Sequence, residues 1–155
     1  MSIAVALSGG ADSLLSLVLM LEKNEKPFAV HGFFLAPDVK AIKARNKIED
    51  LCSNLGVKLY SLDLSLAFKE RVIEPFVQTY LQGKTPNPCA LCNKEIKFGL
   101  LLEKALELGA SKLATGHYAG LECNCPQAPG LFRGPDTSKE QSYFLSLLSK
   151  EQLSR

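Results

Sequence analysis

Ser8-Gly9-Gly10-Ala11-Asp12-Ser13 lies between an apolar run from Ile3 to Leu7 and an apolar segment from Leu14 to Leu21. This order predicts a strand, a glycine loop and a helix. Two adjacent glycines permit backbone angles that a Cβ would forbid, and they let backbone N–H groups approach an anion closely. Because a helix begins at the loop, its unpaired N–H groups and the positive end of its dipole face the same point. The segment therefore predicts a site for a phosphate or a pyrophosphate.

Two common phosphate-binding motifs are missing here. A Walker loop needs a lysine after its glycines, and a dinucleotide fingerprint needs Gly-x-Gly-x-x-Gly; neither occurs before Glu22. The remaining Ser-Gly-Gly-x-Asp-Ser pattern resembles the PP-loop of the N-type ATP pyrophosphatases, which adenylate a substrate and release pyrophosphate. The resemblance implies that Asp12 helps to hold Mg²⁺ and that the phosphates of ATP are bound by Ser8, Gly9, Gly10, Ala11 and Ser13. The alternative is an ordinary Gly-Gly turn with Asp12 as a helix N-cap.

The composition is that of a globular protein. Hydrophobic residues make up 46% and charged residues 22% of the 155 residues, and the longest apolar stretch is too short to span a bilayer. A chain of 155 residues fits a single domain. The start of the chain shows no secretory signal, so we expect a cytoplasmic protein with no membrane partner. A net charge of +2 gives only a mild bias toward polyanions and does not identify a binding partner. Five cysteines, an odd number, favour reduced thiols for chemistry or metal binding over a disulfide framework.

Short apolar runs alternate with helical patterns along the chain. Further strands are expected at residues 28–35, 57–62 and 112–115, and further helices at residues 39–55, 66–81 and 91–108. Such alternation predicts an α/β fold with a parallel sheet of at most five strands, with ligands at the carboxyl ends of the strands. The helix at 39–55 is expected to turn Ile42, Ile48, Leu51 and Leu55 toward the sheet.

Prolines and glycines predict the irregular parts of the chain. Pro75 should kink or split the helix at 66–81, and two prolines should keep residues 85–93 in a stiff, largely extended loop. An irregular loop is expected at about 118–137, with a brief strand at 131–133 inside it. One or two short helices should follow within residues 142–153.

Cys89-x-x-Cys92 places two thiols at the start of an expected helix. A restrained loop and a helix N-terminus both lower a thiol pKa from its usual value of about 8.5. Three uses remain open: half of a zinc site, a redox or sulfur-carrying pair, and buried structural thiols. Zinc would need two further ligands, and Cys123-Asn124-Cys125 has a shorter spacing than the usual zinc knuckle.

Four segments, in this order, resemble the tRNA 2-thiouridine synthases of the MnmA type. They are the loop at 8–13, the cysteine-bearing run at 83–99, the strand-end motif at 114–119 and the segment at 136–145. The resemblance implies a three-layer sandwich of the adenine nucleotide alpha hydrolase-like class, also called HUP or PP-loop ATPase. It implies that ATP adenylates O2 of the wobble uridine in certain tRNAs and that a persulfide-borne sulfur then displaces AMP. The implied partners are tRNA and a sulfur-donor protein, either a cysteine desulfurase or a sulfur relay protein.

The resemblance also assigns roles to single residues. Cys92 would carry or deliver sulfur as a thiolate nucleophile, with Cys89 beside it. Gly116 and His117 would contact the nucleotide, although His117 could instead be a hydrogen-bonded structural histidine. The residues implied near the nucleotide or the target base are Lys139, Gln141 and Ser142. Alternatively, these three residues are ordinary solvated polar residues on a helix, without a role in binding.

The chain departs from the family in ways that leave alternatives open. We expect the N-terminal catalytic domain over residues 1–155, as a natural short relative or a fragment, without the family's central and β-barrel domains and second catalytic cysteine. Cys89 stands where some relatives have aspartate. Cys89 and Cys92 could form their own sulfur relay, or bind an iron–sulfur cluster with Cys123 or Cys125 as a third ligand. Another adenylating ligase or amidotransferase, or a noncatalytic module that binds ATP or tRNA, remains a competing hypothesis.

Overall fold

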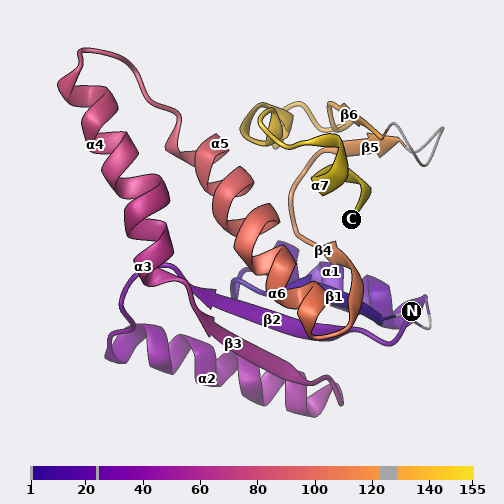
Figure 1. Cartoon of the computed structure of the whole chain (residues 1–155). Helices are drawn as coiled ribbons and strands as arrows, with labels where there is room; N and C mark the ends of the chain where they lie inside the picture. The colour runs from indigo at the N-terminus through magenta and orange to yellow at the C-terminus, as the bar shows by residue number, and fades with distance from the viewer. Residues whose placement is uncertain (1, 24, 123–128) are drawn as a thin grey trace. The chain divides into compact units, whose positions relative to one another are not determined.

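The computed structural model describes residues 2–23, 25–122 and 129–155 (Figure 1). The chain forms two compact units, one of Met1–Leu66 with Leu101–Gly116 and one of Ala67–Leu100 with His117–Arg155. The elements of the first unit are β1 (Ser2–Ala6), α1 (Ala11–Glu22), β2 (Phe28–Phe33), α2 (Val39–Asn54), β3 (Leu59–Asp63), α6 (Leu102–Glu107) and β4 (Ala110–Ala114).

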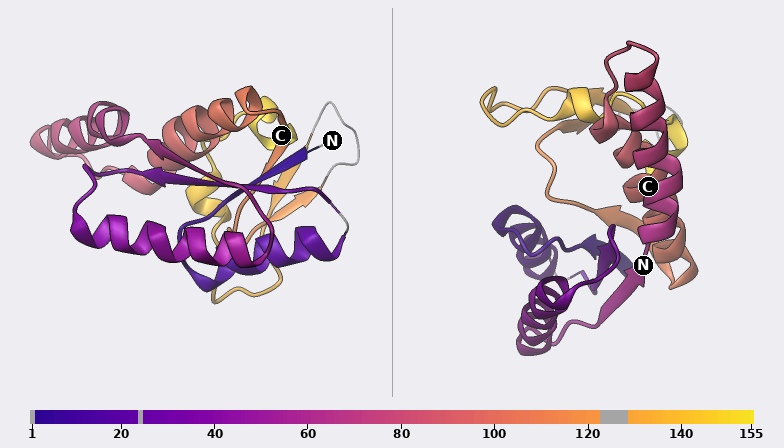
Figure 2. Two further views of the ribbon diagram at one scale, coloured as in Figure 1. Left: turned by 90° about the horizontal axis from the view of Figure 1, so that it is seen from below. Right: turned by 90° about the vertical axis from the view of Figure 1, so that its left-hand side faces the viewer.

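A four-stranded sheet of order β3-β2-β1-β4 forms the centre of the first unit. All its pairings are parallel, and Val5 of β1 lies opposite Ala29 of β2 and Ala114 of β4. The predicted parallel α/β sheet of at most five strands is confirmed. Figure 2 shows α1 and α2 on one side of this sheet and α6 on the other. Because the chain leaves β1 toward β2 and returns to its other side as β4, a topological switch point lies at the carboxyl end of β1, where open α/β sheets bind ligands.

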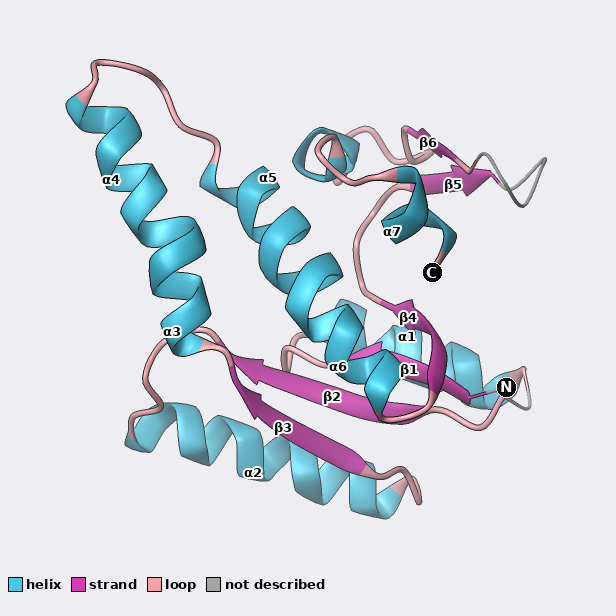
Figure 3. Ribbon diagram, viewed as in Figure 1, coloured by secondary structure: helices cyan, strands magenta, loops and turns pink. Residues whose placement is uncertain are grey.

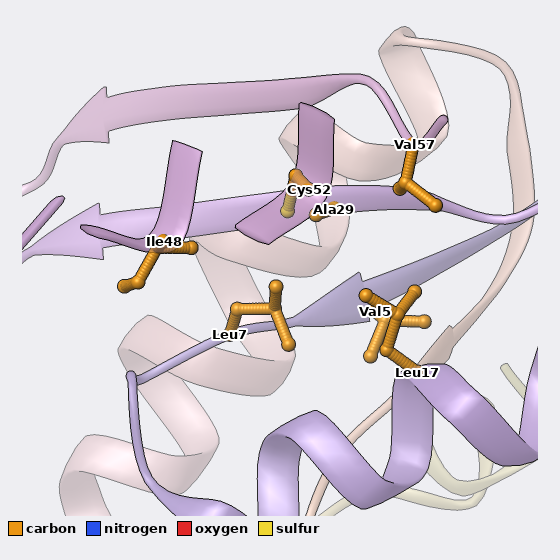
Figure 4. Packing of buried hydrophobic residues seen from close by; sticks show 7 residues of the cluster. All are labelled: Val5, Leu7, Leu17, Ala29, Ile48, Cys52 and Val57. Carbon is orange, nitrogen blue, oxygen red and sulfur yellow. The ribbon is translucent and has the colours of Figure 1, made fainter. Parts of the chain in front are cut away.

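The core between the sheet and the two helices α1 and α2 is apolar (Figure 4). Its members are Val5, Leu7, Leu17, Ala29, Ile48, Cys52 and Val57. The prediction for α2 was correct for Ile48 and wrong for two others, because Ile42 is 47% and Leu55 41% exposed. Cys52 follows Ile48 by one helical turn and therefore shares its face, whereas Ile42 stands in the first turn and Leu55 beyond the end of the helix.

A continuous helical run begins at the end of the first unit and continues into the second at Ala67. α3 (Ser65–Phe68) leads into a π-helical segment, η1 (Lys69–Ile73), and then into α4 (Glu74–Leu81). The backbone N–H of Glu74 donates to Lys69 O, five residues back. Pro75 is the second residue of α4 and lies inside the continuous run, where its missing N–H and its ring would disturb a regular α turn. The wide π turn thus carries the helix past Pro75 without splitting it.

A second helical run carries both cysteines of the Cys-x-x-Cys motif. α5 (Pro88–Cys92) continues into the π-helical segment η2 (Asn93–Leu101) and then into α6. The helix begins three residues before the predicted start at Leu91, so the expectation of a loop through Asn93 was wrong. Asn87 caps the helix, since its side chain accepts from Ala90 N at 3.1 Å, and Pro88 fits the first helical position because its missing N–H would be unpaired there anyway.

The rest of the second unit consists of short elements (Figure 3). β5 (Gly120–Glu122) pairs antiparallel with β6 (Gly130–Phe132), and a 3-10 turn, η3 (Ser142–Leu145), precedes α7 (Lys150–Ser154). The predicted strand near 131 and the predicted short helices are confirmed, whereas β5 was not expected. Cys123 and Cys125 lie outside the described residues.

Among the described helices, none combines the length and the apolar character needed to cross a bilayer. The cytoplasmic location stays a prediction.

Candidate nucleotide and sulfur sites

The loop after β1 has the strand-loop-helix geometry that its sequence predicts. Gly9 has a φ of 88°, a conformation that L side chains rarely adopt, and α1 begins directly after Gly10. Gly10 is the N-cap residue, with no side-chain cap bond, so the alternative that Asp12 caps the helix was wrong. The first N–H groups of a 12-residue helix are therefore not capped by a side chain of the loop, as an anion site requires.

Two serine hydroxyls hold the shape of this loop. Ser13 is only 6% exposed, and its Oγ donates to Gly10 O at 2.8 Å and accepts from Ser8 N at 3.3 Å. Ser8 Oγ accepts from Gly10 N at 3.3 Å and lies 3.2 Å from Ser13 Oγ. Both hydroxyls thus brace the loop backbone, and their predicted role as phosphate ligands stays a prediction.

Gly116, predicted at the nucleotide site, lies against the first turn of α1. A Cβ on Gly116 would stand 2.8 Å from the backbone C of Asp12 and from Ser13 N, so only glycine fits. Ser16 Oγ reinforces the contact, since it donates to Asp12 O at 3.0 Å and to Thr115 O at 3.1 Å. The ends of β1 and β4 therefore meet at the glycine loop.

A hollow of about 240 Å³ opens beside the loop. It is lined by Leu7, Ser8, Gly9, Ser13 and Leu14, and by Ala44, Lys47, Ile48 and Leu51 of α2. Lys47 is the cation among them. The volume is below the roughly 300–1,000 Å³ of typical ligand pockets, so the hollow suits part of a nucleotide. Sequence reasoning missed Lys47, although the helical spacing from Ala44 to Leu51 places it on the same face as Ile48.

The second unit holds Cys89 and Cys92 on the single turn of α5. Cys89 is exposed and Cys92 is half-buried. Burial raises the pKa of the Cys92 thiol, the Lys97 ammonium lowers it and Cys89 raises it, so that the pKa lies above its usual value. The predicted lowering was therefore wrong for Cys92, because removal of the thiolate from water outweighs the nearby positive charge.

His117 contacts two residues of η2. Its Nε2 lies 3.4 Å from Lys97 Nζ, and its ring centroid lies 5.7 Å from that of Phe98. Burial and the charge of Lys97 lower the pKa of His117 from 6.5 to about 4. The imidazole is therefore neutral at pH 7, and its Nε2 can accept a hydrogen bond from Lys97. Its predicted contact with the nucleotide stays a prediction.

The segment around Gln141 is tied to the chain just after His117. Gln141 Oε1 accepts from Tyr118 N at 3.0 Å, and Gln141 N donates to Tyr118 O at 2.8 Å. Lys139 Nζ lies 5.1 Å from the centre of the Tyr118 ring, a cation–π contact. Ser142 N donates to Glu140 Oε1 at 2.6 Å. Gln141 and Lys139 thus gather around Tyr118, while the predicted substrate contacts of all three candidates stay predictions.

Asn93 connects the cysteine helix to the same segment, which sequence reasoning did not anticipate. It is 3% exposed, and its Nδ2 donates to Phe144 O at 2.9 Å. Gln152 makes a second connection, since its Nε2 donates to Lys94 O and Phe98 O, both at 2.8 Å. The helix that carries Cys92 is therefore fixed to residues 50 and more positions further along the chain.

The described residues hold no group of three or more His, Cys, Asp or Glu side chains that could bind a metal ion. A zinc ion or an iron–sulfur cluster on Cys89 and Cys92 would need further ligands. The predicted candidates, Cys123 and Cys125, lie outside the described residues.

Known proteins resemble the whole chain. It is 50% identical to the "tRNA-specific 2-thiouridylase MnmA" of Oleidesulfovibrio alaskensis and 46% identical to the protein of that name from Nitratidesulfovibrio vulgaris strain Miyazaki F, over 99% of this chain and 45% of each relative. The protein of that name from Treponema denticola is 42% identical, over 100% of this chain and 44% of the relative. The chain thus spans less than half the length of these relatives. It matches the family described as "tRNA methyl transferase HUP domain" over residues 1–155. With its glycine loop at the switch point of a parallel sheet, the chain belongs to this HUP-domain family.

Proposed function

We propose that this chain is the ATP-using part of an enzyme that thiolates tRNA, converting wobble uridine to 2-thiouridine. The observation that carries the proposal is the glycine loop at the carboxyl end of β1. Gly9 has a positive φ in this loop, and Gly116 packs against the first turn of α1. Relatives 42–50% identical to the chain are named tRNA-specific 2-thiouridylases, which supports tRNA as the substrate.

In the first step, uridine O2 attacks the α-phosphorus of ATP, the uridine becomes linked to AMP, and pyrophosphate leaves. Negative charge grows on the leaving pyrophosphate, and fixed N–H donors stabilise it without rearrangement. Gly9 and Ala11 would supply such donors at the positive end of α1, and Gly10 N, which donates to Ser8 Oγ in this structure, would turn to the pyrophosphate. Lys47, in the adjoining hollow, adds a positive charge.

Asp12 suits the predicted role in holding Mg²⁺. Its side chain is exposed in the first turn of α1, beside the loop, and carboxylate oxygens are the ligands that Mg²⁺ prefers, together with the phosphates of a substrate. The bound ion would neutralise charge on the phosphates.

In the second step, sulfur replaces the activated oxygen. The Cys92 thiolate attacks the terminal sulfur of a donor persulfide, so that Cys92 gains a persulfide and the donor leaves as a thiolate. The terminal sulfur of Cys92, once deprotonated, attacks C2 of the uridine, and AMP leaves with the former O2. Cys89 then attacks Cys92 Sγ. A Cys89–Cys92 disulfide forms, the sulfur remains on C2, and a dithiol reductant regenerates both thiols.

The position of the two cysteines supports this relay. They are three residues apart on one helical turn, so both sulfurs share one helix face. An iron–sulfur cluster is the second hypothesis for the same thiols, with Cys123 or Cys125 as a further ligand. Anaerobic reconstitution with iron and sulfide separates them, because only the cluster predicts a visible absorption band that the Cys89→Ala variant loses.

The experiment that tests the function incubates the chain with unmodified tRNA, ATP, Mg²⁺ and a persulfide donor, and measures 2-thiouridine by mass spectrometry of the nucleosides. We expect product with the wild-type chain and none with Asp12→Ala or Cys92→Ser. Cys52→Ala is the matched control, since Cys52 is a buried core thiol of the first unit that no proposed step uses, and it should stay active.

Other outcomes identify the competing functions. AMP production that persists in Cys92→Ser and needs ammonia instead of tRNA would indicate a ligase or amidotransferase. ATP binding without pyrophosphate release, with or without tRNA, would indicate a noncatalytic module. Thiolation by Cys92→Ser would refute the role of Cys92.

A further inference from the structure

The π-helical geometry of η2 places Lys97 one turn after Cys92. In an α-helix a residue is followed on the same face by the residues three and four positions on, whereas a π turn closes after five. Cys92 is the last residue of α5, and Lys97, five positions on, is the fifth residue of η2. The width of this turn shows at Gly99, where an added Cβ would stand 2.9 Å from the carbonyl oxygen of Lys94, five residues back.

His117 holds the ammonium of Lys97 in place. Its Nε2 lies 3.4 Å from Lys97 Nζ, and its own ring packs against Phe98 at 5.7 Å between centroids. A histidine in the charged form would repel Lys97. The neutral form offers a lone pair to the ammonium, so the contact fixes the position of the Lys97 side chain.

We propose that Lys97 is a positioning residue for sulfur transfer: its ammonium, held by the neutral ring of His117, stabilises the anionic sulfur on Cys92. The inference rests on the proposed function, since sulfur transfer is the reaction that needs this anion. When the Cys92 proton passes to solvent, the thiolate is stabilised by the charge of Lys97. The same charge then stabilises the persulfide anion that forms after Cys92 has taken the terminal sulfur of the donor persulfide.

The influences on the pKa of Cys92 within this unit act in opposite directions. Lys97 favours the thiolate, while burial and the neighbouring Cys89 disfavour it. Burial outweighs the charge of Lys97, so the pKa of Cys92 lies above its usual value, and without that charge the thiolate would be rarer still. A lysine that only filled space between η2 and His117 would not affect the thiol in this way.

The test measures the rate at which iodoacetamide alkylates Cys92 as a function of pH, with each cysteine followed separately by peptide mass spectrometry. We expect Lys97→Gln to move the midpoint of the Cys92 profile upward by about one pH unit. Lys97→Arg keeps the positive charge and should keep the midpoint close to that of the wild type. His117→Ala should move the midpoint upward, as Lys97→Gln does. Lys94→Gln is the matched control. Lys94 lies on the same segment but pairs with Glu95 at 3.6 Å, and its loss should leave the profile unchanged.

An unshifted Cys92 midpoint in Lys97→Gln would overturn the inference, as would an equal shift in Lys94→Gln. A second measurement needs no variant: NMR of the wild-type chain should show His117 titrating near pH 4, and an ordinary value near 6.5 would show that His117 does not hold a charged Lys97. Alkylation needs neither ATP nor tRNA. A Lys97-dependent profile in a chain that never makes 2-thiouridine would therefore refute the proposed function alone. Thiolation by the wild type, with a Cys92 profile that ignores Lys97, would refute this inference alone.

Discussion

Gly9 and Gly10 are neighbours with different backbone requirements. Gly9 has a φ of 88°, whereas Gly10 has a φ of −84° and room for a Cβ at 3.5 Å from Ser8 Oγ. We expect Gly9→Ala to lower the free energy of unfolding by about 1–2 kcal/mol, since an L side chain is strained at positive φ. Gly10→Ala should leave it unchanged or raise it by up to about 1 kcal/mol. Urea denaturation followed by circular dichroism measures both, and equal losses would contradict the loop geometry.

His117 should make stability depend on pH in a defined window. Its pKa is about 4 in the folded chain against an ordinary 6.5, so between these values the unfolded chain binds more protons than the folded one. The free energy of unfolding should therefore rise as pH increases from 4 to 6.5, and the contribution of His117 should be constant above that range. His117→Asn should flatten this part of the profile. Urea denaturation at a series of pH values measures it, and a His117→Asn profile parallel to that of the wild type would contradict the assignment.

At the scale of elements, the π-helical segment η2 makes an unusual demand on Gly99. In a regular helix, Gly→Ala raises stability by roughly 0.5–1 kcal/mol. Here the added Cβ would stand 2.9 Å from Lys94 O, a backbone atom, so we expect Gly99→Ala to lower the free energy of unfolding by about 1–3 kcal/mol. Gly134→Ala is the control, because its Cβ would make only ordinary contacts at 3.8 Å. A gain in stability from Gly99→Ala would show that η2 is α-helical in solution.

The sequence predicts the ends of several elements better than their starts. Gly56 and Gly109, with φ of 66° and 97°, follow α2 and α6 where the sequence places their ends. The start at Pro88 was missed, because proline is as common at the first helical position as in an extended loop. β5 was missed because three residues, Gly-Leu-Glu, show no alternation. The π turns leave no signal either, since a short apolar run does not distinguish spacings of four and five residues.

At the scale of the whole molecule, the alternation of strands and helices was sufficient to predict the parallel sheet, while its order β3-β2-β1-β4 depends on contacts that no local pattern contains. The same holds for the candidate sites. The loop at 8–13 could be identified from adjacent residues. The packing of Gly116 on Asp12 and the contact of His117 with Lys97 join residues about 20 to 100 positions apart. Cys92 shows the limit most clearly, because its burial, which the motif does not reveal, reverses the direction of its pKa shift.

The proposed reaction, which needs both units of the molecule, transfers one identifiable atom: the O2 of the wobble uridine should leave on AMP. Incubation of the chain with ATP, a persulfide donor and tRNA labelled with oxygen-18 at this position, followed by mass spectrometry of AMP, follows that atom. We predict AMP that carries one heavy oxygen, in an amount equal to the 2-thiouridine formed, and no labelled AMP from Asp12→Ala. Unlabelled AMP formed together with 2-thiouridine would contradict adenylation of the uridine.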